Sequence, residues 1–175
     1  QSWNRSLANQ TGLTPRYMGQ SSYQINGGNE VPEGFPDFFK ARTAEEAREL
    51  VKHYADSGVD ILKVYSELSP DAYFALADEA RRKGLRVEGH RPIKVSLEDM
   101  LTAGQRSVEH ARLFLFECYE AADEFRALPN PLSAYTDDLR RRLVDGHDDQ
   151  RCRKLIDRLA DSETWWTPTL QTLRM

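Results

Sequence analysis

Apolar residues in the middle of the chain recur at helical spacing, and each repeat is preceded by residues suited to capping a helix. Thr43 and Glu46 have the spacing of a capping box, in which each side chain bonds the other residue's backbone amide. Ser69 followed by Pro70 combines an N-cap with a proline at the first helical position. Glycines follow the repeats and can adopt the left-handed conformation that ends a helix. The pattern predicts helices over residues 43–58, 69–84 and 96–104.

Short runs of branched apolar residues separate these helices. They predict strands at residues 59–64, 85–87 and 107–108, with a further strand at 165–170. Strict alternation of strands and helices is typical of parallel strands joined by crossover helices. The sequence therefore predicts an α/β fold, with βα units over residues 43–110.

The regions on either side have a different character. Residues 1–42 are rich in Gly, Asn, Ser and Pro, and we expect them to be irregular apart from one strand. Residues 111–161 are predicted to form a helical insertion and crossover, and residues 162–175 a last strand. Three helix breakers divide the insertion into about three helices: Pro129, Pro131 and Gly146. At 175 residues the chain is short for a complete (β/α)₈ barrel, which needs ~250, so we expect one domain, 1–175, with a partial TIM-type barrel fold.

Three residues of suitable chemistry stand where predicted strands end. Lys63 lies in ILKVYS, His90 closes LRVEGH, and His110 closes SVEH. In a parallel α/β barrel the active site forms at the carboxyl ends of the strands, so side chains far apart in sequence can meet there. Two imidazoles suit Zn²⁺ or another divalent cation, which would lower the pKa of a bound water.

The charge and composition of the chain limit the kinds of partner that it is expected to bind. The net charge is −4, which gives no electrostatic reason to expect nucleic acid. No apolar run approaches the ~20 residues of a membrane span. Cys118 and Cys152 are far apart and are expected to be ordinary thiols, and His53 and His147 to be surface residues. The chain begins with Gln rather than Met, so its localisation is not predicted.

The run GVDILKVY … LADEARRKGLRVEGH … AGQRSVEHA resembles the amidohydrolase superfamily, in the branch of imidazolonepropionase-like and prolidase-like enzymes. Members commonly show a strand with Ile-Lys-Val, a strand ending in His, and then Ile-Glu-His. The segments TPRYMGQSS and WWTPTL resemble the third and seventh strands, so that the resemblance covers about residues 11–170.

The resemblance implies a metal-dependent hydrolase of amide or cyclic amide C–N bonds. Lys63 would be a carboxylated lysine that bridges two divalent metals, and His90 and His110 would be ligands of the second metal. A bridging hydroxide would attack the substrate, a small-molecule or peptide-like amide. Three neighbouring residues would contact substrate or support the ligands: Arg16, Tyr65 and Arg91.

Departures from the family pattern shape a further expectation. The chain has no His-x-His, the family's first ligand pair, and it ends at Met175, before the strand-eight Asp that acts as ligand and general base. Asn29 stands where prolidase-like members often have His, which disfavours a dipeptidase-like substrate. We therefore expect an internal piece of a larger enzyme, with its catalytic residue unknown.

Two other functions fit parts of the pattern. A lysine at a strand end could form a Schiff base, as in lyases and aldolases, although that chemistry does not need His90 or His110. A non-catalytic module that uses the partial barrel for assembly would fit the absence of half of the family's ligands.

An open partial barrel leaves unpaired strand edges and exposes apolar residues that closure would bury. Each exposed Val, Leu or Ile forfeits ~1.5–3 kcal/mol of burial, whereas a stable domain holds only ~5–15 kcal/mol in total. We therefore expect the chain to form a homo-oligomer, a symmetric dimer being the simplest, and to lack hydrolase activity by itself. Sedimentation with and without Zn²⁺ checks the first expectation, and a monomer at high concentration would contradict it.

Overall fold

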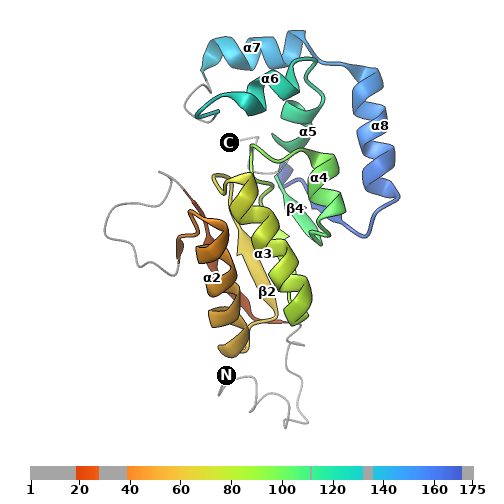
Figure 1. The fold of residues 1–175 in the computed structure, drawn as a ribbon. Coiled ribbons are helices and arrows are strands. Elements are labelled where there is room, and N and C mark those ends of the chain that lie inside the picture. Colours follow the sequence, from red (N-terminus) through yellow and green to blue (C-terminus); the bar gives the residue numbers. More distant parts are fainter. Residues whose placement is uncertain (1–18, 28–38, 111, 132–135, 171–175) are drawn as a thin grey trace.

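The computed structural model describes residues 19–27, 39–110, 112–131 and 136–170 (Figure 1). Strands and helices alternate through the first part and give way to helices in the second. The elements are β1 (Ser21–Ile25), α2 (Ala44–Asp56), β2 (Ile61–Val64), α3 (Pro70–Lys83), β3 (Arg86–Gly89), α4 (Leu97–Thr102), β4 (Ser107–Glu109), α5 (Arg112–Glu117), α6 (Ala122–Ala127), α7 (Asp137–Asp145), α8 (Asp149–Ala160) and β5 (Trp165–Thr167). The predicted alternation of helices and strands over residues 43–110 is confirmed.

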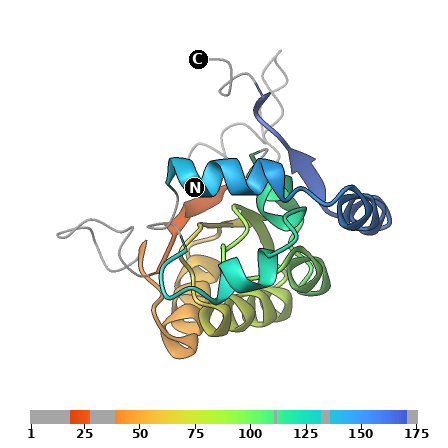
Figure 2. The same ribbon diagram turned by 90° about the horizontal axis from the view of Figure 1, so that it is seen from above.

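All paired strands are parallel, as expected for βα units. A three-stranded sheet has the order β1-β2-β3, and β4 pairs with β5 in a second sheet. The Arg106 amide donates to the Val87 carbonyl at 2.8 Å, which places the start of β4 beside β3. In the view from above, α2, α3 and α4 lie on one side of the strands (Figure 2). The described residues form a mixed α/β fold with small parallel sheets, and among them the strands do not close into a barrel.

The predicted caps explain where the helices begin. Thr43 accepts a hydrogen bond from the Glu46 amide at 3.1 Å, and Ser69 accepts one from the Ala72 amide at 3.2 Å. The Glu46 carboxylate reaches back to the amide of Arg42 at 2.7 Å, one residue before the N-cap. These bonds satisfy amides that have no partner within the helix.

A single apolar cluster packs α2, α3 and α4 against the strands. Its fully buried members include Ile25, Leu62, Val64, Tyr73, Leu76, Leu97 and Met100. Tyr73 donates to the buried Gln105 side chain at 2.9 Å, and burial raises the pKa of the Tyr73 hydroxyl. The Gln105 amide nitrogen donates to the Ser107 carbonyl at 2.8 Å and to the His90 carbonyl at 3.3 Å. Gln105 thus links the buried Tyr73 to the backbone after β3 and to the first residue of β4.

The helical region differs from the prediction in one respect. Its described residues, 112–131 and 136–161, form four helices, α5 to α8, rather than about three. The extra break falls at Tyr119, which forms an antiparallel bridge with His147. Residues 118–121 contain no proline or glycine, so no local signal predicts this break. A second apolar cluster fills the region: Ile93, Phe116, Tyr119, Ala122, Phe125, Leu139 and Leu143.

The prediction that the two cysteines are unpaired thiols is wrong. Cys118 and Cys152 form a disulfide, with their Cα atoms 4.7 Å apart across 34 residues of sequence. The Asp148 amide donates to the Cys118 carbonyl at 2.8 Å, which brings the start of α8 against the end of α5. This tertiary contact, which sequence spacing does not reveal, brings the two sulfur atoms together.

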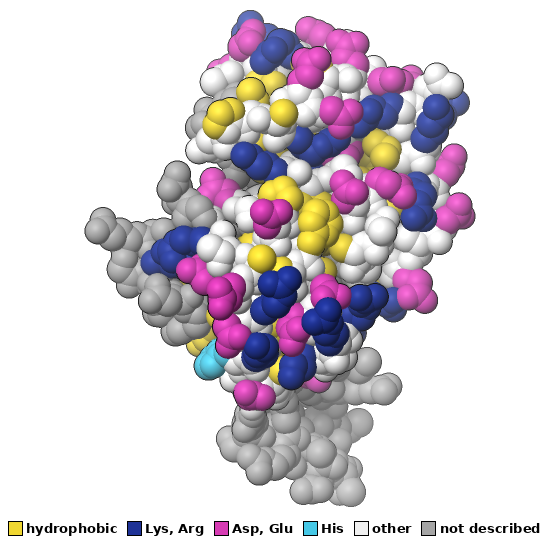
Figure 3. Space-filling model, in the orientation of Figure 1, with side chains coloured by type: hydrophobic (Ala, Val, Ile, Leu, Met, Phe, Trp, Pro, Cys, Tyr) yellow, Lys and Arg dark blue, Asp and Glu magenta, His cyan; other side chains and the backbone are white. Residues whose placement is uncertain are grey.

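Acidic and basic side chains are interspersed on the surface, and hydrophobic ones gather near the middle of one face (Figure 3). On α3, Asp78 pairs with both Arg81 and Arg82 at 2.7 Å. Two tryptophans of β5 are solvent-accessible, with Trp165 77% exposed and Trp166 37% exposed. Within the described residues, no helix combines the length and apolar character needed to cross a membrane.

Glycine is required at residue 89, where β3 passes close to β2. Gly89 has φ of 117°, and a Cβ there would lie 2.5 Å from the Val64 carbonyl oxygen. We expect Gly89→Ala to lower the free energy of unfolding by more than about 2 kcal/mol, because backbone atoms of both strands must move. Gly84→Ala is the matched control: φ is 70° there, but no atom lies within 4 Å of the new Cβ. It should cost only ~1 kcal/mol in urea unfolding, and equal costs would contradict the close approach.

Candidate metal centre

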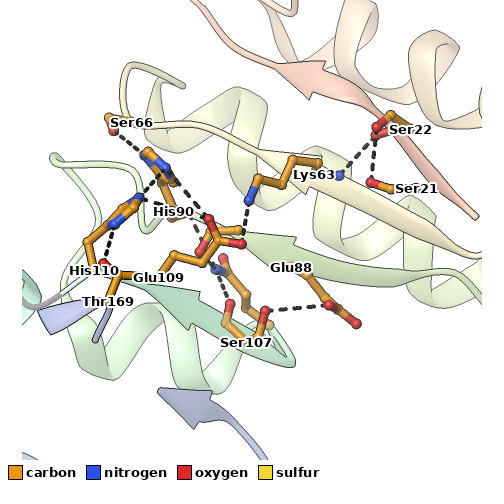
Figure 4. A network of polar contacts seen from close by, with 12 residues as sticks. Ser21, Ser22, Lys63, Ser66, Glu88, His90, Ser107, Glu109, His110 and Thr169 are labelled. Carbon is orange, nitrogen blue, oxygen red and sulfur yellow. Dashed lines mark hydrogen bonds and ion pairs between the residues drawn. The ribbon is translucent and has the colours of Figure 1, made fainter. Parts of the chain in front are cut away.

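Polar side chains from three successive strands meet at one end of the strands (Figure 4). Lys63 lies on β2, His90 follows β3, and Glu109 and His110 stand at the end of β4. Val64 pairs with Gly89 in the parallel register, and the His90 amide donates to the Val64 carbonyl at 2.9 Å. Parallel pairing therefore brings the predicted residues Lys63, His90 and His110 to the same place.

The two imidazoles are held with corresponding nitrogens facing each other. The Nε2 atoms of His90 and His110 are 3.1 Å apart. On the far side of each ring, Nδ1 contacts a hydroxyl: Ser66 at 2.9 Å for His90, and Thr169 at 2.8 Å for His110. A hydrogen bond at one ring nitrogen fixes the ring orientation and sets which nitrogen is left to act as a ligand. Both rings are thus oriented with Nε2 toward a common point.

Glu109 completes the cluster, and it was not among the site residues predicted from the sequence. One carboxylate oxygen lies 3.8 Å from His90 Nε2 and 4.0 Å from His110 Nε2. The other oxygen forms an ion pair with the Lys63 ammonium. The available signal was the Glu-His pair that ends the strand, but a carboxylate next to a ligand candidate is common by chance.

The geometry of these three donors fits one divalent cation. The donor atoms of His90, Glu109 and His110 all lie within 4.8 Å of one another. Tetrahedral zinc with bonds of ~2.0–2.1 Å separates its ligand atoms by about 3.4 Å. The separations of 3.1, 3.8 and 4.0 Å bracket that value, so shifts of a few tenths of an ångström would accommodate an ion. Two imidazoles and a carboxylate also suit other divalent transition metals.

The residues expected to contact substrate or to support the ligands occupy different surroundings. Tyr65 stacks on the His90 imidazole with ring centroids 3.9 Å apart, so it borders the cluster. Arg91 is buried and turned into the protein, where it lies 3.2 Å from the Glu117 carboxylate. Burial lowers the pKa of the Arg91 guanidinium, and the Glu117 charge opposes that shift. Arg16 lies outside the described residues.

A separate hollow lies at the other end of the strands and does not include the candidate ligands. Its volume is about 460 Å³, and it lies between the start of β1 and the end of α2. Its lining is Gln20, Ser21, Ser22, Tyr23, His53, Tyr54, Ser57 and Val59. Burial raises the pKa of the Tyr54 hydroxyl to about 12, and the lining contains one histidine, His53, with no carboxylate or cysteine beside it. The hollow therefore lacks the convergent ligands found at the strand ends.

Comparisons with known proteins return only distant structural similarity. No protein-family model and no curated protein matches the chain. Among solved structures, bottromycin amidohydrolase shares 23% identity at a TM-score of 0.45, covering 77% of this chain and 40% of that structure. An uncharacterised protein shares 15% identity at a TM-score of 0.48, covering 95% and 51%. A Bifidobacterium longum protein assigned as a prolidase shares 16% identity at a TM-score of 0.38, covering 79% and 48%.

The chain thus spans about half or less of the length of these three structures. Two of them bear the names of hydrolases, one an amidohydrolase and one a prolidase. The identities and TM-scores are too low to carry an argument about activity. What this chain could do chemically therefore depends on its own residues.

Among the described non-glycine residues, left-handed backbone occurs at the candidate ligand His110 and at Thr169, whose hydroxyl contacts the His110 ring. His110 has φ of 71°, a left-handed conformation that costs most L-residues ~1–2 kcal/mol. We expect His110→Gly to be about 1 kcal/mol more stable than His110→Ala, because both lose the imidazole but only glycine adopts this conformation freely. Urea unfolding of the two variants measures the difference. A less stable glycine variant would show that the backbone is not strained at this position.

Proposed function

We propose that this chain carries part of the active site of a metal-dependent hydrolase that acts on amide or cyclic amide C–N bonds. The observation that supports the proposal is the convergence of His90 Nε2, His110 Nε2 and the Glu109 carboxylate at the carboxyl ends of parallel strands. Active sites of parallel α/β barrels form at this end. The resemblance of the same strand ends to the amidohydrolase superfamily favours hydrolysis over other uses of a metal.

In this proposal His90 and His110 would hold a divalent cation through Nε2. Ser66 and Thr169 orient the two rings through Nδ1. Zn²⁺ or a related ion, when bound, would polarise the substrate carbonyl and lower the pKa of a coordinated water. Tyr65 stacks on His90 and limits how far that ring can turn. The general base is not identified among the described residues.

Lys63 could act at this site as a positively charged ammonium or as a negatively charged carbamate. As an ammonium it neutralises Glu109, but it also repels a cation bound nearby. The ammonium would first lose a proton, and attack of the free amine on CO₂ with release of a second proton would give an anionic carbamate whose oxygens two metals could share. We propose that Lys63 is carboxylated when the centre is loaded and that the complete centre is binuclear. Metal binding should then depend on bicarbonate.

The direct test is metal titration of the purified protein by calorimetry, with and without bicarbonate. His90→Ala and His110→Ala should each weaken binding of Zn²⁺ at least 100-fold, because each removes a ligand. Ser66→Ala and Thr169→Val should weaken it ~10–100-fold, because the rings lose their orientation. Lys63→Met should weaken binding and remove the bicarbonate dependence.

The outcomes that contradict the proposal are distinct. His53→Ala, an exposed histidine on α2, is the matched control and should leave Zn²⁺ binding unchanged. Tighter binding by Lys63→Met would show that Lys63 acts only as a repelling ammonium and would overturn the carbamate. Unchanged binding by both His90→Ala and His110→Ala would overturn the centre itself. We expect the chain by itself to be inactive, so the reaction is tested on a protein that also supplies the rest of the active site, where chelation should remove hydrolysis of amide and cyclic amide substrates and Zn²⁺ should restore it.

A borohydride experiment separates the hydrolase proposal from Schiff-base chemistry at Lys63. Schiff-base formation by Lys63 predicts that borohydride traps a carbonyl substrate on the protein, whereas the hydrolase proposal predicts no such adduct.

We also propose that the chain associates with copies of itself. The exposed tryptophans of β5 support this, because strand edges with exposed apolar residues favour pairing.

A further inference from the structure

A second group of potential metal ligands lies in the helical region and shares no residue with the strand-end centre. Cys118 follows α5, His147 precedes α8, and Cys152 lies in the first turns of α8. One donor atom from each of these residues lies within 4.8 Å of the other two. Cys118 is fully buried, and the His147 side chain is 41% exposed. The cluster therefore lies where solvent and small ions can reach one side of it.

The backbone holds these three residues together independently of the sulfur–sulfur bond. Tyr119 and His147 form an antiparallel bridge, and the Glu120 amide donates to the Gly146 carbonyl at 2.9 Å. The Asp148 amide donates to the Cys118 carbonyl at 2.8 Å, and the Cys152 amide donates to the Asp148 carbonyl at 2.9 Å. None of these backbone bonds involves a sulfur atom, so reduction of the disulfide removes none of them directly. The two thiols would therefore stay close to each other and to the imidazole.

Two thiolates and one imidazole are a donor set that zinc prefers. Four residues separate His147 from Cys152, within the spacing of three to five that is common for paired zinc ligands. Asp149 lies 3.3 Å from His147 Nε2, where a carboxylate can orient an imidazole that binds through its other nitrogen. Cys152 lies near the N-terminus of α8, a helix of 12 residues whose dipole favours a thiolate.

We propose that Cys118, His147 and Cys152 form a redox-controlled zinc site, closed as a disulfide and able to bind metal when reduced. A dithiol reductant supplies two electrons and two protons to the sulfur–sulfur bond and is itself oxidised to a disulfide. The two thiols that form then each release one proton when they bind Zn²⁺. Three protein ligands leave the fourth tetrahedral position to water. This site is independent of the hydrolase proposal, because the strand-end ligands contain no sulfur.

The test uses Co²⁺ as a spectroscopic substitute for zinc in a His90→Ala/His110→Ala background, which removes the other centre. After reduction with a phosphine and removal of oxygen, we expect thiolate-to-cobalt charge-transfer absorption in the near ultraviolet, with visible bands typical of a tetrahedral ion. Zn²⁺ should displace the cobalt and abolish the absorption. The oxidised protein should show none of these bands.

Variants define the ligands and the outcomes. Cys152→Ser, at a half-buried position, should abolish the charge-transfer absorption or leave only that of a single thiolate. His147→Gln should weaken cobalt binding at least tenfold, whereas His53→Gln should not change it. Circular dichroism checks that each variant is folded, and a thiol reagent checks that two free thiols are present after reduction.

Three results would overturn the proposal. The first is a folded, fully reduced protein that shows no thiolate-to-cobalt absorption. The second is equal cobalt binding by the oxidised and reduced protein. If His147→Gln bound cobalt as tightly as its parent, the histidine would not be a ligand and the proposed donor set would be wrong.

Discussion

The candidate centre depends on the close parallel contact between β2 and β3. Gly89 lies so near the Val64 carbonyl that no side chain fits between them. That closeness lets the His90 amide continue the ladder at 2.9 Å, which fixes the start of the loop bearing the imidazole. Tyr65, one residue after β2, then stacks on the His90 ring. A wider separation of the two strands would uncouple the lysine and the first histidine.

Electrostatics within the centre are organised around Glu109. Its two oxygens face different partners, the Lys63 ammonium on one side and the paired imidazoles on the other. The arrangement is neutral while Lys63 carries a proton, but a divalent cation would upset that balance. Carboxylation of Lys63 would replace its positive charge by a negative one, and this change offsets the two positive charges of one divalent cation. The same four residues could therefore alternate between an ion-paired form and a metal-loaded form.

The helical region adds a structural link to this centre through buried charge. Glu117 lies next to Cys118 in sequence, and its carboxylate contacts both Arg91 and Arg126, at 3.2 and 2.7 Å. Because Arg91 directly follows His90, the ion pair fixes the helical region against the loop that leaves the strand end. Buried charges of this kind stabilise little in total, but removing one partner is costly.

Much of the local structure was predictable because its causes are local. Capping by Thr43 and Ser69 involves residues three apart, and the strand-end positions of Lys63, His90 and His110 follow from the alternation of strands and helices. Tertiary structure alone decided which groups meet: the Glu109 carboxylate between lysine and imidazoles, the burial of Arg91, and the Cys118–Cys152 pair. Apart from the adjacent Glu109 and His110, these contacts join residues 19 to 46 positions apart, or turn a side chain inward, and no local pattern encodes them. They arise from packing of whole elements, because burial of apolar faces determines which strand ends and loops become neighbours.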